Sequence, residues 1–207
     1  MEYSEDRRII KTRKEIINAF NTLLNEKSFS KITIAELAKK ANINRGTFYL
    51  HYLDKYDLIN QCEQEIFTQI TNISKNPPFN QTLRDVNALQ QVVLKGYPPA
   101  FIIHLLEYFQ KNSELLKAIL GPNGDPSFEK DLKNVFADTF LNNAETFLDI
   151  SKLTVKLELL VEIVASIYMS VIRYWLSNGV QESPEELAEI LFDMASKGPL
   201  KASGIVN

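Results

Sequence analysis

Hydrophobic residues recur every three or four positions along most of the chain, the spacing that places them on one face of an α-helix. We see no pattern typical of strands, no internal repeat and no low-complexity segment. The pattern predicts an all-α protein of about nine to ten helices. The predicted helices span residues 5–27, 33–41, 44–50, 55–74, 79–94, a segment beginning at Pro98–Pro99, 114–120, 127–148, 153–178 and 183–196.

The most informative stretch runs from Thr33 to Lys55. Thr33 and Glu36 have the Thr-x-x-Glu spacing of a capping box, which begins a helix. Asn42 tolerates the left-handed conformation of a tight turn, and Asn44 is a good cap for a second, short helix. The stretch therefore predicts a helix-turn-helix.

The second helix of this motif leaves a group of hydrogen-bonding side chains and a glycine exposed. These residues are Arg45, Gly46, Thr47, Tyr49 and His51. Such side chains suit base edges and phosphates, whereas the surface of an ordinary helical bundle carries more Glu, Lys and Ala. We expect the group to face DNA together with Asn44, with Thr33 and Lys55 holding phosphates.

This stretch resembles the DNA-binding domain of TetR-family transcriptional regulators. The residues that match the family pattern are Thr33, Leu37, Ala38, Ala41, Gly46, Thr47, Phe48, Tyr49, His51, Asp54, Lys55 and Leu58. The chain departs from the pattern at Asn42, Asn44 and Tyr52, where the family has Gly, Ser and Phe, and all three changes are physically mild. The resemblance covers about the first 60 residues, and beyond Cys62 it is one of architecture alone.

The resemblance implies an N-terminal three-helix DNA-binding domain at 1–60 and a helical-bundle domain for effector binding and dimerisation at 61–207. It also implies a repressor that a small-molecule effector, not identified by the sequence, releases from a palindromic operator of double-stranded DNA. Two alternatives stay open: control of the same fold by a partner protein, and a helical protein-interaction adaptor that does not bind DNA.

The charge distribution agrees with this division, although the net charge of -3 alone argues against a nucleic-acid binder. Residues 1–60 carry 11 Lys and Arg against 8 Asp and Glu, a net charge of +3. Residues 61–207 carry 12 against 18, a net charge of -6. A basic N-terminal part lets that part face phosphates while the acidic remainder stays soluble.

The last two predicted helices, Leu153–Asn178 and Ser183–Ser196, are apolar enough to form a homodimer interface, as the resemblance also implies. The alternative is that they only complete the core of one chain. The polar candidates for binding an effector in the C-terminal domain are His104, Tyr108, Tyr168 and Arg173. A pocket there is expected to be apolar with one or two polar anchors, and His104 can equally be a core or interface residue.

Several other classes of protein do not fit the sequence. Two His, one Cys and the lack of a Gly-rich phosphate loop argue against an enzyme, a metal site and a cofactor. Cys62 has no partner for a disulfide, which is compatible with a reducing compartment. The longest uncharged apolar run, 163–172, is too short to span a membrane, so we expect a cytoplasmic protein.

Overall fold

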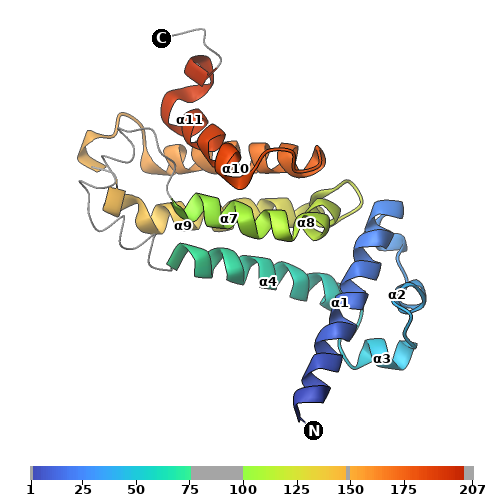
Figure 1. Cartoon of the computed structure of the whole chain (residues 1–207). Helices are drawn as coiled ribbons and strands as arrows, with labels where there is room; N and C mark the ends of the chain where they lie inside the picture. Colours follow the sequence, from blue (N-terminus) through green and yellow to red (C-terminus); the bar gives the residue numbers. More distant parts are fainter. Residues whose placement is uncertain (1, 76–99, 148–149, 203–207) are drawn as a thin grey trace. The chain divides into compact units, whose positions relative to one another are not determined.

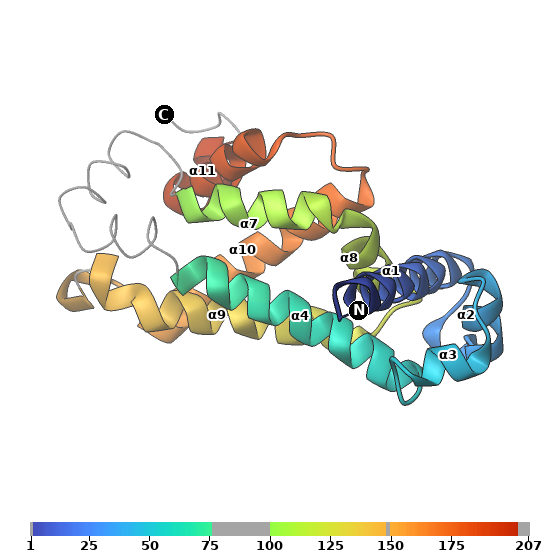
Figure 2. The ribbon, with the colours of Figure 1, turned by 60° about the horizontal axis from the view of Figure 1, so that its bottom comes forward.

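The computed structural model describes residues 2–75, 100–147 and 150–202, and every regular element in these ranges is helical. This confirms the all-α prediction. The elements are α1 (Glu2–Glu26), η1 (Phe29–Lys31), α2 (Ile34–Lys40), α3 (Arg45–Tyr49), α4 (Lys55–Lys75), α7 (Ala100–Lys111), α8 (Ser113–Leu120), α9 (Pro126–Phe147), η2 (Ile150–Lys152), α10 (Leu157–Ser177) and α11 (Pro184–Ala202) (Figures 1 and 2). The helix predicted at 79–94 lies outside the described residues.

Contacts divide the chain into two compact units. The first contains Met1–Ile66 together with Glu114–Phe128, and the second contains Phe67–Ser113 together with Glu129–Asn207. The first unit therefore includes α8 and the loop that follows it, which lie far from the helix-turn-helix in the sequence.

The core of the first unit is built by apolar side chains that recur at helical spacing on α1, α2, α3 and α4. The buried residues of these helices and of the segments that connect them include Ile16, Phe20, Leu23, Leu24, Ile32, Leu37, Ala38, Phe48, Tyr52, Leu58, Ile59, Cys62 and Ile66. Each fully buried large side chain contributes about 1.5–3 kcal/mol relative to exposure. This shared core holds the short helices α2 and α3, which are too short to be stable alone.

The loop after α8 binds to the turn η1 within the first unit. The backbone N–H of Phe29 donates to the carbonyl of Asn123 over 2.8 Å. Gly124 gives the loop its tight path, because a Cβ atom there would lie 1.9 Å from the carbonyl oxygen of Ile119. The position therefore requires glycine for space.

In the second unit, α11 packs against both α7 and α10 (Figures 1 and 2). The buried side chains there include Leu106, Phe109, Phe136, Ile172, Trp175, Leu176, Leu187 and Leu191. The indole N–H of Trp175 donates to the carbonyl of Glu182 over 3.1 Å. Ser183 and Glu186 cap the N-terminus of α11, since Glu186 N donates to Ser183 Oγ over 3.2 Å and Ser183 N donates to Glu186 Oε2 over 2.8 Å.

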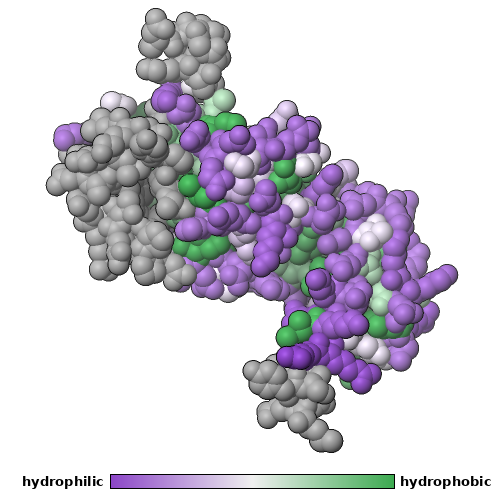
Figure 3. Space-filling view, in the orientation of Figure 1, coloured by the Kyte–Doolittle hydropathy of each residue, from purple (hydrophilic) through white to green (hydrophobic). Residues whose placement is uncertain are grey.

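One face of α10 carries exposed apolar side chains, among them Leu159, Ile163 and Tyr174. In the described part of the chain, α10 alone is long and apolar enough to cross a membrane by length and composition, with 33% of its apolar window buried. A core helix of a globular protein passes the same test, and α10 packs against α11. Elsewhere the face seen in Figure 3 is mostly hydrophilic, with small apolar patches.

Candidate nucleic-acid interface

The N-terminus of α2 is held by the predicted capping box. Thr33 Oγ1 accepts from the backbone N–H of Glu36 over 3.3 Å, and Glu36 Oε2 accepts from the N–H of Thr33 over 3.0 Å. The Thr33 hydroxyl also donates to Glu36 Oε2 over 2.8 Å, and Lys27 forms an ion pair with the same carboxylate. The hydrogen bond from Lys27, followed by those from Thr33, lowers the pKa of Glu36 from its usual 4.5 to about 2.

Glu36→Gln should flatten the acid dependence of stability. Because the pKa of Glu36 is lowered in the folded chain, its contribution is present above pH 4.5 and is lost as the pH falls towards about 2. Gln does not titrate, so the melting temperature of the variant should fall less steeply across this window than that of the wild type. Circular dichroism melts at a series of pH values measure this slope. The control is Glu114→Gln, an exposed carboxylate of the same unit, and parallel curves for wild type and Glu36→Gln would refute the assignment.

The turn between α2 and α3 follows the predicted geometry. Asn42 has a φ of 55°, in the left-handed region. The N–H of Ile43 donates to the carbonyl of Ala38 over 2.9 Å, which ends α2. Asn44 then caps α3, because its Oδ1 accepts from the N–H of Thr47 over 2.7 Å and from the Thr47 hydroxyl over 3.1 Å. The helix-turn-helix predicted from the sequence is therefore confirmed.

The helix α3 is anchored by one side and exposed on the other. Phe48 is completely buried, and its ring lies 5.7 Å from that of Tyr52. Arg45 and Gly46 are exposed, as is 54% of Tyr49. A Cβ atom at Gly46 would lie 3.2 Å from Asn44 Oδ1, so glycine also leaves room for the cap. The anchoring fixes which side chains α3 presents to solvent.

The sequence interpretation missed two large apolar side chains beside this surface. Leu50 is 84% exposed and Leu53 is 81% exposed. Both lie between the buried Phe48 and the buried Leu58 and do not continue the apolar stripe that forms the core. Their positions off this stripe are the sequence signal that could have identified them as exposed. Exposed apolar side chains next to hydrogen-bonding ones suit contact with thymine methyl groups.

His51 is partly buried next to these residues. Its pKa lies below the usual value because of desolvation and, second, the positive charge of Arg13. Both effects favour the neutral form of the imidazole. Arg13 itself lies over the ring of Tyr52, with Cζ 5.7 Å from the ring centroid, and its Nη2 donates to Gln61 Oε1 over 3.5 Å. Arg13 thus links α1 to α4 within the first unit.

The ammonium of Lys55 is bound by the protein. Its Nζ donates to the carbonyls of Phe29, Ser30 and Ile32 over 3.0, 2.8 and 3.0 Å. An ammonium has three N–H donors, so these three bonds use all of them. Lys55 therefore holds backbone carbonyls where the sequence predicts a phosphate ligand. Asp54 caps α4, since its Oδ1 accepts from the backbone N–H groups of Tyr56 and Asp57, each over 2.8 Å.

The four side chains proposed for effector binding have other partners. His104 is exposed and pairs with Glu107 over 3.0 Å, and Arg173 pairs with Glu129 over 3.2 Å. The ring of Tyr168 lies 6.5 Å from that of Phe136, and desolvation raises the pKa of its phenol. The ring of Tyr108 lies 6.0 Å from that of Phe109.

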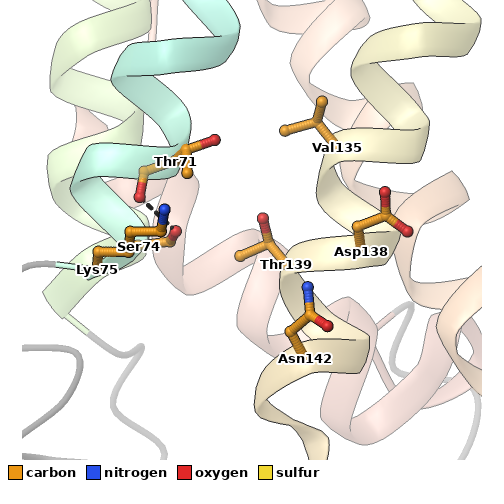
Figure 4. A pocket seen from close by; sticks show the side chains of 7 residues that line it. All are labelled: Thr71, Ser74, Lys75, Val135, Asp138, Thr139 and Asn142. Atoms are coloured by element: carbon orange, nitrogen blue, oxygen red, sulfur yellow. Dashed lines mark hydrogen bonds between the residues drawn. The ribbon is translucent and has the colours of Figure 1, made fainter.

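A cavity of about 390 Å³ lies between the C-terminal end of α4 and α9, and none of those four residues lines it (Figure 4). Its lining residues are Thr71, Ser74, Lys75, Val135, Asp138, Thr139 and Asn142. Lys75 and Asp138 provide opposite charges from the two helices, and Val135 is the one apolar side chain of the lining. Six of its seven lining residues have polar side chains, although the exposed surface of the lining is about equally polar and apolar.

Two protein-family models match the chain. "Bacterial regulatory proteins, tetR family" matches residues 16–62, and "Transcriptional regulator C-terminal region" of the same family matches residues 97–197. The first range contains the whole helix-turn-helix. Together the two ranges include most of the chain.

The chain is also similar to individual proteins, in sequence or in fold. The chain is 33% identical over 106 residues to the uncharacterised helix-turn-helix transcriptional regulator YxbF of Bacillus subtilis, a match that spans 49% of this chain but 27% of YxbF. A TetR transcriptional regulator from Streptococcus agalactiae has a similar fold, with a TM-score of 0.60, 24% identity, and coverage of 94% of this chain and 99% of that one. FadR of Bacillus subtilis in complex with stearoyl-CoA has a TM-score of 0.54, 14% identity, and coverage of 89% and 98%.

Proposed function

Because the chain belongs to the TetR family of DNA-binding transcriptional regulators, we propose that it is a repressor that binds a palindromic operator as a homodimer. One observation carries the proposal: α3 is buried through Phe48 and presents Arg45, Gly46 and Tyr49 to solvent. A short helix with a fixed outward face of this kind fits the major groove.

In this proposal α3 reads the bases and the residues around it hold the backbone. Arg45 and Tyr49 face base edges, and Gly46 allows the helix to approach closely. Thr47 and His51 contact bases or the adjacent backbone. Thr33 and Asn44 stand at the two helix N-termini, where backbone N–H groups suit phosphates even though both side chains are used in caps.

Arg45→Ala should relax the base preference of the operator. A bidentate contact from arginine to guanine is worth about 1–3 kcal/mol, which is lost on the operator but not on random DNA. Titration of both duplexes at one salt concentration measures the difference. Lys39→Ala, which removes an exposed charge from α2, is the control for charge alone. Equal losses on operator and random DNA for Arg45→Ala would exclude base reading by this side chain.

The homodimer is proposed to form through α10 and α11. The exposed Leu159, Ile163 and Tyr174 of α10 and the exposed Ile190 of α11 offer apolar area to a second copy. The two helices also line a shallow groove that includes Ile163 and Met194. A two-fold dimer brings the same surface of each chain together, and reads half-sites about 34–36 Å apart or a multiple of that.

The cavity between α4 and α9 is the proposed effector site. FadR binds stearoyl-CoA in its complex, but six of the seven residues that line this cavity have polar side chains, Lys75 and Asp138 among them. We therefore expect the cavity to bind a small molecule that carries opposite charges or several hydroxyl groups, and to bind a long acyl chain less well. Operator release by a panel of such compounds, with stearoyl-CoA as the comparison, tests this choice.

The direction of control is tested with a reporter gene placed behind the selected operator. Expression of the chain should lower reporter output, and an active effector should restore it. A rise in output on expression of the chain would identify an activator instead.

A further inference from the structure

We infer that Lys55 is a positioning residue for DNA binding, whose ammonium ties the two ends of the helix-turn-helix together. The inference rests on the proposed operator binding. It concerns the segment 33–54, which contains α2 and α3 and is flanked by Ile32 on one side and Lys55 on the other.

The contacts of the ammonium form a closed set, which we call the Lys55 clasp: Nζ of Lys55 and the carbonyls of Phe29, Ser30 and Ile32. The rings of Phe29 and Tyr56 flank the charge, at 4.9 and 5.4 Å from Nζ to each centroid. The two rings meet edge to face at 5.3 Å. Charge-assisted hydrogen bonds in a partly buried place are stronger than those between neutral groups, so the clasp is a firm connection.

The clasp connects two points that matter for the orientation of α2 and α3. Ile32 directly precedes Thr33, the cap of α2, and its side chain is buried. Lys55 is the first residue of α4. Holding these two points together restricts how far the helix-turn-helix can shift or tilt against the rest of the first unit. The outward side chains of α3 then meet base edges in one orientation.

A direct phosphate contact by the same ammonium is disfavoured by this geometry. All three N–H donors already have carbonyl acceptors. A phosphate that displaced the bond to Phe29 or Ile32 would leave a partly buried carbonyl without its partner. The bond to Ser30 is exposed, so it is the one of the three that a phosphate would displace at least cost.

The test compares Lys55→Met with Lys31→Met. Met keeps most of the aliphatic chain of Lys55 and removes the charge and the donors. Lys31 is exposed on the same turn, so Lys31→Met removes one charge nearby and leaves the clasp intact. Dissociation constants are measured for operator and random duplexes over a range of salt concentrations, and urea unfolding gives the folded fraction of each variant.

Loss of the clasp should weaken operator binding about 10-fold or more beyond Lys31→Met, and lower the ratio of operator to random affinity. The slope of log affinity against log salt on random duplex should equal that of the wild type. A slope smaller by about one, with the affinity ratio unchanged, would identify a phosphate ligand and overturn the inference. Wild-type operator affinity of the folded fraction, with only reduced stability, would overturn it as well.

A second measurement needs no DNA. Amide hydrogen exchange of Lys31 and Ile32, whose N–H groups donate to Ser28 and Phe29 carbonyls, should be about 10-fold faster in Lys55→Met, with α10 amides unchanged. Unchanged exchange at Lys31 and Ile32 would mean that the clasp does not hold the turn. If the wild type selects no operator while exchange does respond, the proposed function fails and the clasp is a contact of the fold alone.

Discussion

If the chain forms the proposed homodimer, Ile163→Asp is expected to separate it into monomers and to lower operator affinity at least about 100-fold, or about 2.7 kcal/mol. Ile163 is 48% exposed on the apolar face of α10 and lines the groove shared with α11. A carboxylate enclosed there without a partner loses its hydration, and two-fold symmetry places the change twice in the interface. A monomer has one α3 helix and can therefore contact only one half-site of the operator.

Sedimentation velocity gives the oligomeric state of the variant, and operator titration gives its affinity. Gln110→Asp is the matched control, because it adds the same charge at an exposed position of α7 in the same unit. We expect the control to stay dimeric and to bind the operator as the wild type does. A dimeric Ile163→Asp chain with unchanged operator affinity would exclude α10 from the interface.

Gly124→Ala is expected to destabilise the first unit by about 3 kcal/mol, the upper part of the range for forcing extra atoms into packed structure. The added Cβ would lie 1.9 Å from the carbonyl oxygen of Ile119 and 2.5 Å from its carbon. Both are backbone atoms, which cannot rotate away as a side chain can. The loop must move, and with it the carbonyl of Asn123 that binds Phe29.

Urea unfolding followed by circular dichroism measures this loss of stability. Pro122→Ala, at an exposed position of the same loop, serves as the control and should cost at most about 1 kcal/mol. A loss of less than about 1 kcal/mol for Gly124→Ala would mean that the loop relaxes freely. A loss in the expected range would place the loop among the elements on which the DNA-binding unit depends.

Local chemistry made the helix-turn-helix predictable. The capping box of Thr33 and Glu36, the turn at Asn42 and the cap at Asn44 each involve residues within a few positions of one another. Such contacts depend only on the types of the residues and on their spacing, so they can be predicted from the sequence. The orientation of α3 followed as well, because Phe48 continues the apolar stripe of the core.

Contacts between distant segments were not predictable in this way. Lys55 has the position of a phosphate ligand in the motif, and only the fold brings its ammonium to carbonyls more than 20 residues away. The same holds for the loop after α8, which joins the first unit through Phe29 and Asn123. Nothing in the local sequence distinguishes these residues from others on a polar surface.

The cavity between α4 and α9 was not predictable from the sequence. His104 and Arg173 stood out as polar residues on apolar helices, yet each pairs with a neighbouring carboxylate at the surface. The cavity is lined by Thr, Ser, Lys, Val, Asp and Asn side chains, which resemble ordinary surface residues along α4 and α9. A concave site depends on how two helices face each other, which periodicity along one helix does not contain.

The measurement that tests the central claim most directly is selection of binding sites by the purified wild-type chain from a pool of random duplexes, followed by sequencing. Our account predicts an enriched palindrome with half-sites about one helical turn apart or a multiple of it, bound by two chains or a multiple of two. An enriched site without two-fold symmetry would contradict binding of the operator by a two-fold homodimer. No enrichment by folded, dimeric protein, repeated after unfolding and refolding to remove any bound ligand, would contradict operator recognition by α3.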